Sequence, residues 1–172
     1  GHMDPYFPHV DRLKPVLARH DGLLYLERFR PLDAPEALLS HQHWRDAAAL
    51  AAWRRDTAHR ASQSAGRRLH FEGYRIRVGP EIDCARDTAG PGPARLLVAI
   101  YGPEDISGVA GRRVYESVTR AGRFLTLAEP LTRAEARDSA ERARAAGADE
   151  VRVFDIARDY GMADRAEAPT AD

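Results

Sequence analysis

The sequence predicts an α+β protein with antiparallel sheets, and three observations lead to this class. Apolar runs of strand length recur along the chain, and short turn-forming segments join neighbouring runs. Two longer Ala-rich segments carry apolar residues at helical spacing. In addition, the order hairpin, helix, strand occurs twice, once in each half of the chain.

The first half is predicted to fold as a helix, a hairpin, a second helix and a strand. Asp46 is suited to begin the second helix, because an Asp side chain accepts hydrogen bonds from the free N–H groups of a first turn. Leu50, Trp53 and Thr57 then fall on one stripe, which we expect to pack against the sheet, and Gly66 ends the helix. The predicted elements cover residues 10–20, 23–31, 37–44, 46–66 and 68–78.

The second half is predicted to contain a buried strand, a hairpin, a helix and a last strand. Residues 95–101 form a continuous apolar run, which is typical of a strand buried on both faces. Thr132, with Glu135 three residues later, forms a capping-box pattern at the start of the helix. The remaining predicted elements are a hairpin over 112–129, a helix over 132–147 and a strand over 150–161.

The two halves are predicted to be unequal copies of one unit. The segment EIDCARDT (81–88) matches VFDIARDY (153–160) in register, which favours a duplication over a coincidental similarity of two α+β segments. The first copy has a leading helix but no evident first strand. The predicted division is a first unit over 4–78, a linker over 79–94, a second unit over 95–165 and a polar tail over 166–172.

Composition excludes several classes of partner and site. Lys plus Arg and Asp plus Glu number 26 each, and this balance argues against nucleic acid or a membrane surface as a partner. The single cysteine, Cys84, excludes an intrachain disulfide and a thiolate-rich zinc site. No apolar run approaches the roughly 20 residues of a membrane span, and no signal-peptide pattern is present, so we expect a cytoplasmic protein. The opening GHM is typical of a cloning scar.

Residues 37–78 resemble the core of antibiotic biosynthesis monooxygenase domains. The shared pattern is a strand that ends in Trp44, a helix with Trp53 followed by His59, then Gly66 and an aromatic-rich strand. The resemblance implies ferredoxin-like α+β units whose antiparallel sheets pair into an α+β barrel. Two units in one chain imply a pseudo-dimer, while exposed strand edges leave a homodimer as an alternative.

The strand that ends in Trp44 is the predicted centre of the site. Alternate side chains share one face of a strand, so Ser40, Gln42 and Trp44 point one way, and His41 and His43 point the other. In the resembling family an Asn four residues before the Trp helps to hold the substrate carbonyl. Ser40 stands at that position here, and its hydroxyl can still donate one hydrogen bond.

The candidate residues follow from this strand and its neighbours. A base is expected among His41, His43 and His70, and a metal is not, because no Asp or Glu completes a ligand set. His59 lies about 120° from Trp53 on a helical wheel and is expected at an exposed helix edge. The predicted catalytic residues are Ser40, His41, His43 and Trp44, and the predicted substrate-binding residues are Tyr25, Gln42, Trp53 and His70.

The resemblance implies a small oxygenase that acts on an electron-rich polycyclic phenol or anthrone with molecular oxygen, in bacterial specialised-metabolite biosynthesis. No bound cofactor is expected, since the chain has no Gly-rich phosphate fingerprint, and a reduced flavin would be diffusible. A heme-binding or heme-degrading protein is an alternative, although Gln63 stands where such proteins carry their axial His. A polyketide cyclase and a non-catalytic accessory barrel are further alternatives.

Overall fold

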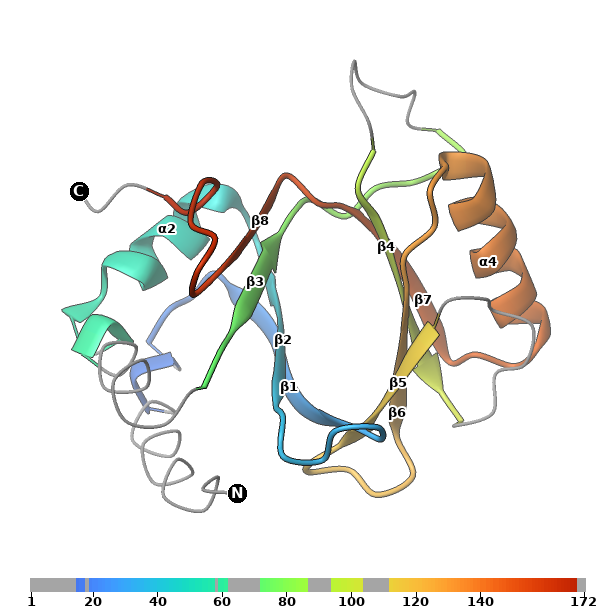
Figure 1. The fold of residues 1–172 in the computed structure, drawn as a ribbon, viewed down its shortest axis with the longest axis horizontal. Coiled ribbons are helices and arrows are strands. Elements are labelled where there is room, and N and C mark those ends of the chain that lie inside the picture. Colours follow the sequence, from blue (N-terminus) through green and yellow to red (C-terminus); the bar gives the residue numbers. More distant parts are fainter. Residues whose placement is uncertain are drawn as a thin grey trace. The chain divides into compact units, whose positions relative to one another are not determined.

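The computed structural model describes residues 15–17, 19–57, 59–61, 72–86, 94–103 and 112–169. The chain divides into two compact units, the first made of Gly1–Arg28 and Leu38–Tyr74, the second of Phe29–Ala37 and Arg75–Asp172. Figure 1 labels the elements, which are β1 (Leu23–Pro31), β2 (Leu39–Trp44), α2 (Ala47–Arg55), β3 (Arg75–Val78), β4 (Leu96–Gly102), β5 (Arg112–Ser117), β6 (Phe124–Ala128), α4 (Arg133–Ala145), β7 (Glu150–Asp155) and β8 (Arg158–Gly161).

In the first unit, β1 pairs with β2 and the chain continues into α2. The predicted cap is confirmed, since Asp46 Oδ1 accepts a hydrogen bond from the Ala49 N–H at 2.7 Å. The predicted length of the helix is wrong, because α2 ends at Arg55 rather than near Gly66. Asp56 leaves the helical conformation (φ −57°, ψ 129°), and its carboxylate accepts the His59 N–H at 3.0 Å. Asp56 therefore caps a new turn instead of continuing α2.

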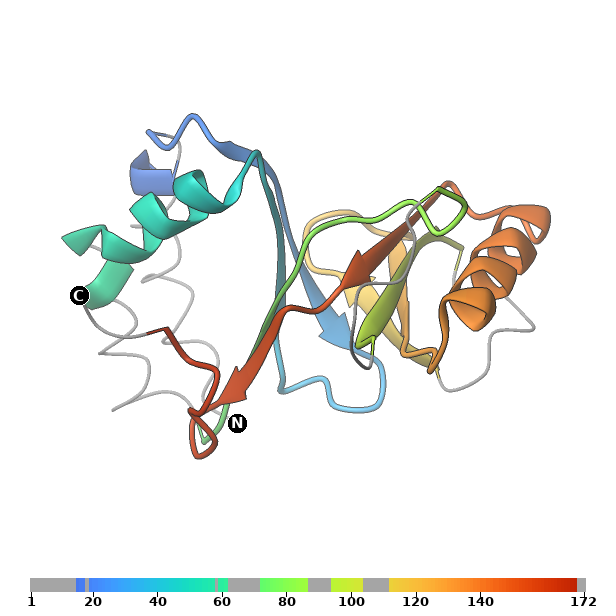
Figure 2. The same ribbon diagram turned by 90° about the horizontal axis from the view of Figure 1, so that it is seen from above.

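In the second unit, the last residues of β1 pair with β5, and the sheet continues in the order β5-β6-β4-β7. Every one of these pairings is antiparallel. The order places β4 between β6 and the edge strand β7, with α4 against one face of the sheet, as Figures 1 and 2 show from two directions. The predicted α+β class with antiparallel sheets is confirmed. The pairing of two sheets into a barrel stays a prediction.

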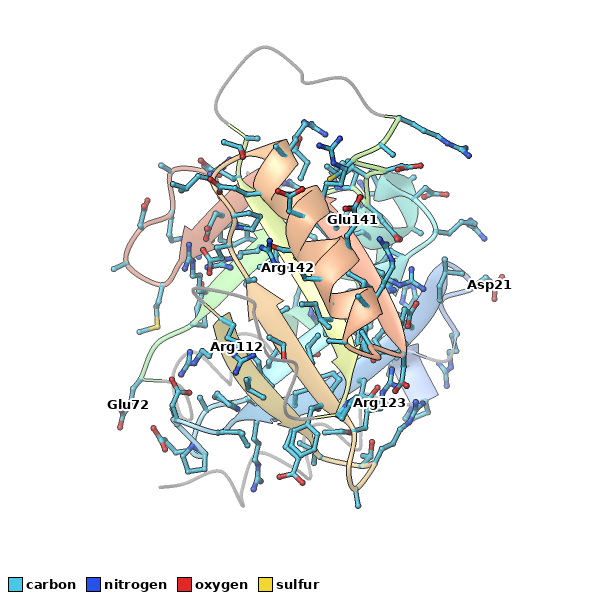
Figure 3. The ribbon with its side chains drawn as sticks, turned by 90° about the vertical axis from the view of Figure 1, so that its right-hand side faces the viewer. Asp21, Glu72, Arg112, Arg123, Glu141 and Arg142 are labelled. Carbon is cyan, nitrogen blue, oxygen red and sulfur yellow. The ribbon has the colours of Figure 1, made fainter. Side chains whose placement is uncertain are left out.

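The core of the second unit lies between α4 and the sheet. The capping box is confirmed in part: Thr132 Oγ1 accepts the Glu135 N–H at 3.1 Å, but the Glu135 carboxylate accepts the Leu131 N–H at 2.8 Å. The opposite face of the helix is exposed and charged, as Glu141 and Arg142 show (Figure 3). The buried residues that form the cluster are Leu96, Val98, Ile100, Ala128, Ala136, Ala140, Ala143 and Val153.

The last predicted strand is not continuous. It is interrupted at Ile156 and Ala157, and β8 pairs antiparallel with β3, from Arg75 opposite Gly161 to Val78 opposite Arg158. The two strands run side by side in Figures 1 and 2. Gly79 is required at this crossing, because a Cβ there would lie 2.0 Å from the Asp155 carbonyl oxygen.

Residues next to β3 also contact β7. The Ile82 N–H donates to the Val153 carbonyl at 2.9 Å, and Glu81 forms an antiparallel bridge with Phe154. Part of the stretch predicted as a linker therefore lies against the second unit's sheet. Of the strand predicted over 68–78, residues 75–78 are β3, and residues 62–71 lie outside the described part of the chain. No helix among the described residues is long and apolar enough to cross a membrane.

Candidate functional site

The first unit carries two polar groups of side chains on the two faces of β2. Ser40, Gln42 and Trp44 interact with one another on one face, while His41 and His43 interact on the other. This is the alternation that the strand periodicity predicts. The predicted site residues are thus divided between two places, and they do not line one pocket.

On the first face, three side chains form a chain of hydrogen bonds. The Trp44 indole N–H donates to Gln42 Oε1 at 3.1 Å, and Gln42 Nε2 donates to Ser40 Oγ at 3.2 Å. An indole N–H can only donate, so it fixes which end of the Gln42 amide faces Ser40. Ser40 Oγ is then an acceptor within the chain, and its own O–H is left to donate outward from an exposed position.

Aromatic rings from three segments gather beside Trp44. Trp53 of α2, which is 3% exposed, stacks on Trp44 with ring centroids 6.2 Å apart and planes at 24°. The His59 ring stacks on the Trp53 ring at 4.1 Å and 21°. His20, from the turn before β1, presents its ring edge-on to both tryptophans, at 6.4 Å from Trp44 and 5.1 Å from Trp53. The result is an aromatic cluster in which Trp53 is buried and Trp44 is half-buried.

His20 also has a carboxylate partner. Its Nε2 lies 3.4 Å from Asp56 Oδ2, and both side chains are partly buried, at 20% and 24% exposure. A carboxylate can only accept, so Nε2 carries the hydrogen and Nδ1 is the basic nitrogen. A carboxylate behind an imidazole fixes its tautomer and stabilises the charged ring that forms when it takes a proton. His20 and Asp56 therefore have the arrangement of a general base with its orienting group.

His59 is held in one neutral tautomer. Its Nδ1 lies 3.1 Å from the Trp53 carbonyl oxygen, which can only accept, so Nδ1 carries the hydrogen and Nε2 has a free lone pair. Burial lowers the pKa of His59 to about 4, against the opposing effects of that hydrogen bond and of the Asp56 charge. The ring is consequently uncharged at neutral pH. The expectation of an exposed His59 is wrong, because the helical wheel ended when α2 stopped at Arg55.

The second face of β2 holds a separate group of side chains. His41 Nε2 and His43 Nε2 lie 2.7 Å apart. Tyr25 of β1 packs against both rings, with centroid distances of 6.0 Å to His41 and 4.9 Å to His43. The Tyr25 hydroxyl donates to Glu27 Oε2 at 2.5 Å, and Glu27 is only 4% exposed. This second group, made of Tyr25, His41 and His43, is therefore separate from Trp44 and the side chains hydrogen-bonded to it.

The strand pattern predicts the half of the candidate site that lies beside Trp44, but not the other half. Ser40, Gln42, Trp44 and Trp53 are brought together as predicted, whereas His70 lies outside the described residues. His20 and Asp56 were not predicted. The available signal was Asp56, three residues before His59 and inside the expected helix. Asp favours helix starts over helix interiors, so it indicated a break in the helix there.

The part of the chain that the structure describes shows few features of a cofactor site. It has no group of three or more His, Cys, Asp or Glu side chains placed to hold a metal ion. A cavity of about 320 Å³ lies in the second unit, between α4, β7 and the segment 81–85, which includes the half-buried Cys84. None of the predicted site residues lines this cavity.

The comparisons with known proteins agree with the predicted fold class. The family model described as antibiotic biosynthesis monooxygenase matches residues 1–65. The resemblance seen in the sequence is therefore confirmed, and the match overlaps it over residues 37–65. The match includes Ser40, Trp44, Trp53 and His59 and ends before the second half, so the duplication stays a prediction.

A named relative extends the similarity to nearly the whole chain. Over 200 aligned residues, 96% of this chain and 90% of the relative, the sequence is 28% identical to the jasmonate monooxygenase ABM of Pyricularia oryzae (strain 70-15 / ATCC MYA-4617 / FGSC 8958). Both comparisons support a monooxygenase-like function. No solved structure gives a significant match.

Proposed function

We propose that the chain is a small oxygenase that oxidises an electron-rich polycyclic phenol or anthrone with molecular oxygen. The observation that carries this proposal is the His20–Asp56 pair beside the stacked rings of Trp44 and Trp53. A base beside a flat aromatic surface suits a planar substrate with an acidic C–H or O–H bond. The pair lies within the residues that match the monooxygenase family.

Each group has one task in this reaction. The half-buried Trp44 binds the planar substrate through stacking and apolar contact, and the buried Trp53 holds the Trp44 ring in place. His20 removes a proton from the carbon to be oxidised, and Asp56 stabilises the imidazolium that results. Negative charge then develops on the substrate carbonyl oxygen, to which the Ser40 hydroxyl donates a hydrogen bond. Gln42 does not contact the substrate but orients Ser40.

The reaction balances without a reductant. The carbanion passes an electron to oxygen, and recombination gives a hydroperoxide at the same carbon. Loss of water then leaves a ketone, so that R₂CH₂ + O₂ gives R₂C=O + H₂O. Two C–H bonds break, one oxygen atom enters the product and the other leaves as water. Hydroxylation of a saturated carbon would require two further electrons, which a diffusible reduced flavin could supply.

Oxygen uptake with an anthrone, and separately with jasmonate, tests the proposal. The anthrone should be consumed without added reductant, and jasmonate should be consumed only with reduced flavin. The His20→Gln variant should reduce anthrone turnover by about 10²-fold or more. Asp56→Asn should also reduce it, because an amide presents the wrong hydrogen to His20. Arg19→Gln, at a neighbouring exposed position, is the control. Full activity of His20→Gln would rule out this base.

A heme-binding function is a second candidate, favoured by His59. Its Nδ1 hydrogen bond to the Trp53 carbonyl leaves Nε2 free, which is the arrangement of an imidazole ready to bind a metal. Heme would supply iron chemistry with oxygen. Titration with hemin tests this function: a saturable Soret band at one equivalent, lost in His59→Ala, would favour it over the cofactor-free oxygenase.

A further inference from the structure

A pair of imidazoles on the first unit's sheet lies outside the site just described. His41 Nε2 and His43 Nε2 are 2.7 Å apart, with ring centroids 4.8 Å apart and planes at 74°. Both side chains project from the face of β2 opposite to Trp44. Two nitrogens this close can share one hydrogen, and they can equally face a common cation.

The separation of the two nitrogens fits a particular coordination geometry. Imidazole nitrogens that each lie about 2.0–2.1 Å from an ion are about 2.9 Å apart at a right angle and about 3.4 Å apart at a tetrahedral angle. The distance between His41 Nε2 and His43 Nε2 is nearer to the first value. Right angles between nitrogen ligands are the preference of Cu²⁺ and Ni²⁺ rather than of structural Zn²⁺.

Neighbouring side chains hold the two rings in place. The Tyr25 ring packs against His43 at 4.9 Å and 33°, and meets His41 edge-on at 6.0 Å and 73°. Its hydroxyl is fixed in turn by the buried Glu27 carboxyl group, at 2.5 Å. All four residues lie on β1 and β2, so the backbone ladder limits how far the nitrogens can separate. Rigid elements make a more exact ligand pair than loops do.

We propose that His41 and His43 bind a divalent transition-metal ion of the Cu²⁺ or Ni²⁺ kind through their Nε2 atoms. The ion replaces the hydrogen shared between the rings, and each ring keeps its hydrogen on Nδ1. With two protein ligands in the described residues, the remaining positions of the ion are open to water or to small-molecule donors. This site is independent of the Trp44 face.

Calorimetric titration of the chain with Ni²⁺ tests the site directly. The parent protein for this experiment carries His2→Ala, because the imidazole of His2 would bind metal itself. We expect one saturable equivalent of Ni²⁺ in this parent. His41→Ala and His43→Ala should each weaken binding at least tenfold, whereas Leu24→Ala, at an exposed position of the same unit, should leave it within twofold.

A second measurement does not depend on the variants folding. Electron-spin-echo spectroscopy of the parent with one equivalent of Cu²⁺ should detect two coordinated imidazoles. Absence of binding in the parent, binding that survives either single variant, or a spectrum with one imidazole or none would overturn the proposal. Loss of binding in both variants together with two imidazoles would establish it.

Discussion

The two units place a helix against a sheet in opposite ways. In the second unit, α4 packs four small residues, Ala136, Ser139, Ala140 and Ala143, against the buried strands beneath it. In the first unit, α2 buries a single large side chain, Trp53, which meets Trp44, His20 and His59. The small-residue face allows close approach and fills space with apolar contacts. The aromatic face leaves polar atoms at its border.

The contact in the second unit is suited to stability, whereas the contact in the first unit carries groups that can take part in a reaction. A close-packed apolar contact has no room for a substrate and no group that can move a proton. Among the residues that the structure describes, the first unit has fewer buried apolar side chains, but its aromatic contact is bordered by the imidazoles, the Asp56 carboxylate and the Ser40 hydroxyl.

The largest effect is expected from Trp53→Ala. The substitution removes the one side chain of α2 that is fully buried, and large-to-small changes of this kind cost about 3–5 kcal/mol in the free energy of unfolding. Urea unfolding measures the loss. Leu24→Ala is the control, because Leu24 is 66% exposed and its truncation should change stability by about 0.5 kcal/mol or less. Equal losses would mean that α2 is not anchored by Trp53.

A smaller effect on stability is expected from enlarging a side chain in the contact between α4 and the sheet. Ala136 of α4 is fully buried against the sheet, so Ala136→Leu should overpack the interface and cost about 1–3 kcal/mol. Ala134→Leu, at an exposed position of the same helix, is the matched control and should be nearly neutral. An unchanged unfolding midpoint for Ala136→Leu would show that the contact has unused space.

The hydrogen bonds that join Trp44, Gln42 and Ser40 should contribute less to the free energy of unfolding than either of these contacts. Gln42→Leu removes the amide that donates to Ser40 and leaves no polar atom to replace it, so that hydrogen bond of about 0.5–1.5 kcal/mol is lost. Unfolding of Gln42→Leu, Ser40→Ala and the double variant forms a cycle. The second substitution should add little to the loss of stability caused by the first. Fully additive losses would argue against a hydrogen bond between the two side chains.

The smallest effect at neutral pH concerns His59. Its pKa is about 4 in the folded chain against 6.5 for an ordinary histidine, so the unfolded chain takes up the proton first. The contribution of the neutral His59 ring to the free energy of unfolding is fully present above pH 6.5 and is lost as the pH falls towards 4. Unfolding measured across this range should show a steeper acid loss in the natural chain than in His59→Asn. Parallel curves would contradict the low pKa.

Strands and helix starts could be predicted because their signals are local. The hairpin over β5 and β6, the continuous apolar β4 and the Thr132 cap depend on residues within a few positions of one another. The alternation of Ser40, Gln42 and Trp44 against His41 and His43 is equally local, and the structure has it. Half of the candidate site followed from this pattern.

The remaining features depend on contacts between distant residues. His20 contacts Asp56, which lies 36 positions away in the sequence, and the periodicity of neither segment predicts that contact. The end of α2 at Asp56 is a competition between continuing the helix and capping the next turn, which single residue preferences do not decide. The break between β7 and β8 likewise follows from the pairing of β8 with β3, far back in the chain.

That pairing has a consequence for synthesis and folding. Arg75 of β3 and Asp159 of β8 form a two-point ion pair across 84 positions of sequence. At about 5–20 residues per second, β3 leaves the ribosome about 4–17 s before its partner strand has been made. During that interval its backbone groups have no ladder to join, and any other exposed strand can compete for them. The last strand to be translated thus determines when the sheet is finished.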